Sequence, residues 1–184
     1  MNMIASPGQL RASFIRWALV LVPVILLLGF VSGALADSGP SNSWFAGLTK
    51  PAVYPPPATF GIVWSILYVL MGLATAMIAS ARGAPGRGAA LAVFAVQFLL
   101  NLAWSPLFFG MHQMTNALYL LLAIDIAVLA TLVLYWRVRR VAGMLLLPYL
   151  AWVLFATFLN WQFIQANPDA DGRPTSNAVS RFQI

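Results

Sequence analysis

Charged residues divide this chain into long apolar runs. No Asp, Glu, Lys or Arg occurs in residues 51–81, 88–124 or 141–168. Uncharged apolar runs longer than about 18 residues are typical of helices that cross a hydrocarbon layer roughly 30 Å thick. The pattern predicts five spans, which we expect at Phe14–Leu35, Thr59–Ala81, Gly88–Met111, Met114–Trp136 and Val141–Gln165.

The period of the pattern excludes the other membrane architecture. A transmembrane β-barrel alternates apolar and polar residues with a period of two, whereas residues 118–124 are continuously apolar. Hydrophobic residues make up 61% of the chain and charged ones 8%, against about a quarter charged in soluble domains. We expect an all-α integral membrane protein, a five-transmembrane-helix bundle. Its parts are an N-terminal segment (1–13), a membrane domain (14–166) and a polar tail (167–184).

The basic residues predict the orientation of the bundle. Seven lie on the side of the N-terminus and three on the other side, namely Arg11, Arg16, Arg82, Arg87, Arg137, Arg139 and Arg140 against Lys50, Arg173 and Arg181. The positive-inside rule then makes the N-terminus cytoplasmic. We expect a multi-pass protein of a bacterial cell membrane, although an outer membrane stays open. The basic residues are dispersed, so nucleic acid is not an expected partner.

The first span imitates a secretory signal peptide. Arg11 and Arg16 precede its apolar stretch, and Ala34-Leu35-Ala36 resembles a small-residue cleavage site. The stretch is however long for a signal peptide, and Gly29 and Gly33 form a small-residue pattern that packs helices. We therefore expect the first span to be retained.

Aromatic and polar residues recur at helical spacing inside three spans. The stripes are Gln97, Asn101 and Ser105 beside Trp104; Trp152, Ala156 and Asn160; and Trp64 with Tyr68. Polar groups inside a bilayer face the bundle or a cavity. Spacing alone favours interhelical hydrogen bonds and aromatic packing, and an apolar pocket with a few convergent polar groups is the alternative.

Titratable residues within the spans are rare. Asp125, in the middle of the fourth span, is interpreted as a neutral or amide-paired structural acid, with a proton relay as the alternative. His112 has no second ligand at a suitable spacing, and the chain contains no cysteine. We expect neither a metal site nor a cofactor.

The connection between the first two spans (the 37–58 loop) is long and rich in aromatic residues and proline. It contains Trp44-Phe45, Lys50-Pro51 and Tyr54-Pro55-Pro56-Pro57. Proline fixes φ and disfavours helix in the residue before it, which predicts an extended, stiff segment. The loop is either a lid or a simple connector.

From this loop onward the chain resembles the translocator protein family, also called the tryptophan-rich sensory protein (TspO/MBR) or peripheral benzodiazepine receptor family. The resemblance covers roughly residues 14–167 and rests on several motifs in order. They are Trp44-Phe45, Leu48-Thr49-Lys50-Pro51, Pro55-Pro56, Val63-Trp64, Leu67-Tyr68, Met71-Gly72, Gln97, Leu100-Asn101, Trp104-Ser105-Pro106, Phe108-Phe109-Gly110, Pro148-Tyr149-Leu150-Ala151-Trp152, Phe155-Ala156-Thr157 and Leu159-Asn160.

The resemblance implies a ligand pocket. Family members bind tetrapyrroles such as protoporphyrin IX, sterols and synthetic ligands among the helices beneath the first loop. The matching ligand-binding positions are Pro55, Pro56, Trp64, Tyr68, Asn101, Trp104, Ser105, Trp152 and Ala156. Some bacterial members are reported to promote light-dependent porphyrin breakdown, which would make Trp64 and Trp152 catalytic.

Two features depart from the family pattern. The sterol motif at the end of the fifth helix is missing, since residues 159–163 contain no basic residue. The small-residue dimer contact is half present, as Ala92 with Val96, so a homodimer is only a candidate.

The expected function is a membrane receptor or sensor for porphyrins and other hydrophobic ligands. Catalysis of porphyrin photo-oxidation is the alternative. A transporter ranks third, since no inverted repeat or pair of broken helices is evident.

Overall fold

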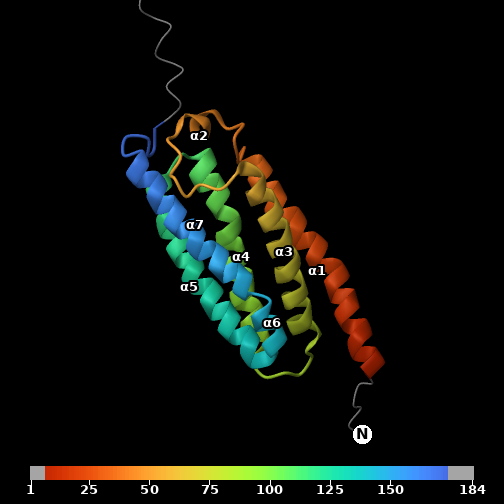
Figure 1. Cartoon of the computed structure of the whole chain (residues 1–184). Helices are drawn as coiled ribbons and strands as arrows, with labels where there is room; N and C mark the ends of the chain where they lie inside the picture. Colours follow the sequence, from red (N-terminus) through yellow and green to blue (C-terminus); the bar gives the residue numbers. More distant parts are fainter. Residues whose placement is uncertain (1–6, 174–184) are drawn as a thin grey trace, which may run out of the picture.

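The computed structural model describes residues 7–173, which contain five membrane spans (Figure 1). The spans are α1 (Pro7–Leu35), α3 (Pro57–Ser80), α4 (Arg87–Ser105) with its π-helical continuation η1 (Pro106–Gly110), α5 (Met114–Val138), and α6 (Arg140–Met144) with α7 (Leu147–Ala166). All five are long and apolar enough to cross a membrane, and the described residues contain no β-strand. The expected fold class is confirmed.

The predicted ends of the chain differ from the observed ones. Helix α1 begins at Pro7, so the second half of the expected N-terminal segment is helical. Residues 167–173 fold back over the bundle, as described below. Residues 1–6 and 174–184, which include Arg181, lie outside the described part of the chain.

Two spans change their helical geometry at or beside a proline. The i+5 hydrogen bond from Met111 N to Pro106 O, 2.9 Å long, widens α4 into η1. Proline has no N–H to donate to the preceding turn, and Pro148 accordingly follows the break between α6 and α7. Arg87–Gly110 and Arg140–Ala166 each still form one membrane-spanning unit, so these changes are local and neither span is a discontinuous helix of the transporter type.

Helix α1 lies on the outside of the bundle, beside α3 (Figure 1). Their close approach depends on Gly72, where an added Cβ would lie 2.7 Å from Val22 Cα. Gly29 faces the ring of Tyr68 across the same interface. The apolar residues on the outer side of α1 remain exposed, as expected for a helix that contacts lipid.

Two buried tyrosines join polar side chains of different helices in the core. The Tyr135 hydroxyl donates to Thr75 Oγ1 at 3.0 Å, and the Tyr149 hydroxyl donates to Gln97 Oε1 at 2.9 Å. The packing interpretation therefore holds for Gln97, which joins α4 to α7.

Asp125 is paired with a hydroxyl group. The Thr157 hydroxyl donates to Asp125 Oδ2 at 2.8 Å and also to the carbonyl of Val153 at 3.0 Å. The carboxyl is thus paired with a hydroxyl between α5 and α7 and not with an amide, and the neutral structural acid stays a prediction.

Candidate functional site

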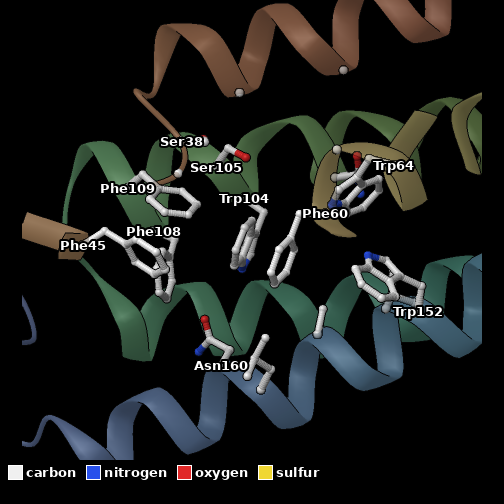
Figure 2. Close-up of a pocket in the computed structure, with 18 of the residues that line it drawn as sticks. Ser38, Phe45, Phe60, Trp64, Trp104, Ser105, Phe108, Phe109, Trp152 and Asn160 are labelled. Carbon is white, nitrogen blue, oxygen red and sulfur yellow. The ribbon is translucent and has the colours of Figure 1, made fainter. Parts of the chain in front are cut away.

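A cavity of about 520 Å³ lies among the five spans, and aromatic side chains form much of its wall (Figure 2). The residues of the sequence-predicted site that line it are Trp64, Tyr68, Asn101, Trp104, Ser105, Trp152 and Ala156. Pro55 and Pro56 do not line it, whereas their neighbours Tyr54 and Pro57 do. The structure therefore brings the three stripes together around one space.

One end of the cavity is formed by rings from α3 and α7. Figure 2 shows Trp64 and Trp152 on these two helices, with Phe60 between Trp152 and Trp104. The Phe60 ring lies 5.8 Å from Trp152 and 5.4 Å from Tyr54, measured between ring centroids. Phe60 precedes Trp64 by four residues, so extension of the same stripe by one turn would have found it.

The other end is formed by η1 and the 37–58 loop. Trp104 stacks on Phe108 with centroids 5.0 Å apart, and Phe45 packs edge-on against Phe109 at 5.1 Å. Phe108 and Phe109, which are adjacent in the π-helical turn η1, both line the cavity.

Small residues of α1 complete the wall. Gly29, Gly33 and Ala34 line the cavity. Gly29 packs against the Tyr68 ring, in agreement with the helix-packing interpretation, and both glycines also line the cavity. Asn160 was part of a stripe but was not among the predicted ligand-binding residues, and it also lines the cavity.

The 37–58 loop covers this end of the cavity and contains a short helix, α2 (Ser43–Gly47) (Figure 1). The expectation that the loop is extended throughout is therefore wrong. Asn42 caps α2 by accepting a hydrogen bond from Phe45 N at 2.9 Å, and its amide donates to Phe109 O at 3.2 Å. We call α2 with residues 48–50 the lid.

Lys50 closes the C-terminal end of α2. Its ammonium donates to the carbonyls of Phe45 and Leu48 and lies 4.2 Å from the centroid of the Phe45 ring. Cations are favoured at such helix ends. Partial burial lowers the pKa of Lys50 below its usual value.

Residues 167–173, which follow α7, form hydrogen bonds with the lid. Thr49 N donates to Asn167 Oδ1 at 2.7 Å, and Asn167 Nδ2 donates back to Thr49 O at 3.0 Å. The Trp44 indole donates to Ala170 O at 3.3 Å. We call residues 167–173 the latch.

His112 links the lid, η1 and the latch. Its ring stacks on Trp44 with centroids 4.6 Å apart, and its carbonyl accepts from Gly172 N at 2.8 Å. Among the described residues, no group of three or more His, Cys, Asp or Glu side chains could hold a metal ion.

Comparison with known proteins shows which family the sequence matches. The profile of the TspO/MBR family matches residues 19–165. The chain is similar to "Tryptophan-rich protein TspO" of Chlorobaculum tepidum, with 34% identity over 148 residues, 80% of this chain and 93% of the relative. "Protein CrtK" of Rhodobacter capsulatus is 33% identical over 82% of this chain and 95% of its own length. The human "Translocator protein" is 40% identical over 73% of this chain and 80% of its own length.

Proposed function

The chain belongs to the TspO/MBR family, and we propose that it is a membrane receptor for a planar hydrophobic ligand of the tetrapyrrole class. Protoporphyrin IX is the ligand that we expect to occupy the cavity beneath the lid. The observation that carries this proposal is the aromatic cavity of about 520 Å³ within the membrane spans. Its volume lies in the range of roughly 300–1,000 Å³ that is usual for small-molecule sites.

The chemistry of the wall supports a flat, apolar ligand. Aromatic rings contribute large apolar areas and stack on other π systems. No Asp, Glu, Lys, Arg or His is among the residues that line the cavity. We assign ligand contacts to Trp64, Tyr68, Asn101, Trp104, Ser105, Trp152 and Ala156, and we exclude Pro55 and Pro56 from this set because neither lines the cavity.

A second candidate function is light- and oxygen-dependent porphyrin degradation. Trp64 and Trp152 line the same end of the cavity from different helices (Figure 2). In this reaction an indole donates one electron to the photoexcited porphyrin, and dioxygen adds to the resulting porphyrin radical anion. Return of one electron to the indole radical cation leaves a neutral dioxygen adduct, in which a carbon–carbon bond of the macrocycle breaks as two carbonyl groups form. Light and dioxygen are both consumed, so the reaction requires both.

One experiment tests the receptor and the catalyst together. Protoporphyrin IX is titrated into the wild type, Trp64→Phe and Trp152→Phe, and each complex is illuminated at matched occupancy with and without dioxygen. A receptor binds the porphyrin in all three, with modest loss where phenylalanine offers a smaller π face. A catalyst loses photodegradation in both variants, because phenylalanine is much harder to oxidise. Absence of saturable binding to the wild type would reject both functions.

Topology and assembly are part of the same proposal. The excess of basic residues on the N-terminal side supports a cytoplasmic N-terminus, which places the lid and the latch on the opposite side. We assign the protein to a bacterial cell membrane. Ala92 and Val96 are both exposed on the outside of α4, where the candidate homodimer contact would form.

A further inference from the structure

Two polar atoms in the cavity wall have no partner. Four buried side-chain nitrogen or oxygen atoms lack a hydrogen bond among the described residues, namely Gln97 Nε2, Trp104 Nε1, Asp125 Oδ1 and Asn160 Oδ1. Only Trp104 and Asn160 of these line the cavity. One atom is an N–H donor and the other is a carbonyl acceptor, so together they form a complementary pair of unused positions.

The orientation of Asn160 is set by the protein itself. Its side chain is only 2% exposed, and its Nδ2 donates to the carbonyl of Met114 at 2.9 Å. An amide that uses its nitrogen in this way must direct its oxygen elsewhere. Figure 2 shows that oxygen directed away from α7, toward the space between Phe108 and Trp104.

Trp104 approaches the same space from α4. Its ring is held by the stack on Phe108, and its indole nitrogen points from α4 toward the side of Asn160 (Figure 2). An indole can only donate a hydrogen bond. Among the side-chain atoms that are almost completely buried, the unpaired donor and acceptor in the cavity wall are therefore those of Trp104 and Asn160.

Buried polar atoms without partners destabilise a protein, because they lose water and gain nothing in return. A ligand group that supplies an acceptor to Trp104 and a donor to Asn160 would remove both deficits. Since no charged side chain lines the cavity, an ionised group would find no counterion there. An un-ionised carboxylic acid and a carboxamide with an N–H each carry the required donor and acceptor.

We propose that Trp104 Nε1 and Asn160 Oδ1 select ligands whose apolar ring system carries one neutral donor–acceptor group, an un-ionised carboxylic acid or an N–H carboxamide. This inference rests on the proposed ligand-binding function, and it specifies which polar group the ligand carries. Both atoms are shielded from solvent in the unliganded structure, so the group reaches them by displacing neighbouring aromatic side chains. For a porphyrin, one side-chain carboxyl group is bound in its neutral form.

The test uses a matched pair of fluorescent probes, N-methyl-1-pyrenecarboxamide and N,N-dimethyl-1-pyrenecarboxamide. Both carry the carbonyl acceptor, and only the first carries the N–H donor. We expect the wild type to bind the N-methyl probe roughly three- to tenfold more tightly, the usual net effect of one hydrogen bond. Asn160→Leu should abolish that preference. Trp104→Phe should weaken both probes and keep the preference.

Asn116→Leu is the matched control. Asn116 is an exposed asparagine of α5 that bonds to Gln113 and does not line the cavity. This variant should bind both probes as the wild type does.

A second measurement does not depend on whether Asn160→Leu folds. The infrared band of a ¹³C-labelled probe carbonyl should move to lower frequency on binding to the wild type, and Trp104→Phe should remove that shift.

Three outcomes would overturn the proposal while leaving the cavity a binding site. They are equal affinities of the two probes in the wild type, an unshifted carbonyl band, and binding of ionised 1-pyrenecarboxylate as tight as that of the N-methyl probe. If neither probe nor protoporphyrin IX binds to the wild type at all, the proposed function itself fails, and this inference fails with it.

Discussion

Asn167→Ala should loosen the lid without unfolding the bundle. Asn167 forms reciprocal hydrogen bonds with both backbone groups of Thr49, at 2.7 and 3.0 Å. Alanine removes both bonds, while the contacts of Trp44 with Ala170 and of Gly172 with His112 remain. The lid should therefore open more often, and the membrane helices should be unaffected.

The magnitude follows from the exposure of these bonds. A protein hydrogen bond contributes about 0.5–1.5 kcal/mol net, and solvent-exposed bonds belong at the lower end of that range. Loss of two such bonds costs about 1 kcal/mol, which is roughly a fivefold increase in the open population of the lid. Local opening of this kind is independent of global unfolding.

Hydrogen exchange measures this effect directly. Amides of α2 and residues 48–50 should exchange about fivefold faster in Asn167→Ala, and bound porphyrin should dissociate faster, with an unchanged melting temperature. Asp169→Ala is the control, because its ion pair with Arg173 is long, at 3.7 Å, and exposed. If hydrogen exchange in the lid is unchanged in Asn167→Ala, or changes equally in both variants, then the hydrogen bonds of Asn167 do not keep the lid closed.

Three further predictions test the packing, the cavity and the lid. Gly72→Ala should lower the free energy of unfolding by about 1–3 kcal/mol, because its Cβ would meet Val22. Gly88→Ala, with nothing within 4 Å, should be neutral in the same thermal melts in detergent. Ala156→Phe should lower porphyrin affinity more than stability, and unchanged affinity with a steep fall in melting temperature would make Ala156 a packing residue. Lys50→Met should speed hydrogen exchange in α2, since two carbonyl partners and the contact with the Phe45 ring are lost; equal exchange rates would contradict that role.

The sequence alone predicted the features that follow from local composition and helical spacing, namely the membrane spans and the faces of the helices. A run such as 51–81 is uncharged whatever it packs against, so the spans follow from composition. Helical spacing likewise places Trp152 and Ala156 on one face, because the backbone geometry repeats. The three stripes therefore converge as expected.

Features that depend on distant partners were not predicted. The proline-rich composition of the 37–58 loop indicated extended chain, but α2 is stabilised by Asn42 and by contacts with η1, more than 60 residues away in sequence. The latch depends on Asn167 meeting Thr49, 118 residues apart. No local propensity contains such information.

Polar residues within the spans show why a stripe does not define a site. Gln97, Asn101 and Asn160 have equivalent amides and all are buried. Gln97 uses only its oxygen, on Tyr149, and does not line the cavity. Asn160 lines the cavity and uses only its nitrogen, on Met114. A membrane cavity can therefore recognise a ligand only through the polar atoms that are not already hydrogen-bonded within the protein. Sequence spacing places each group on a face, and only the structure shows which hydrogen-bonding atoms are left for a ligand.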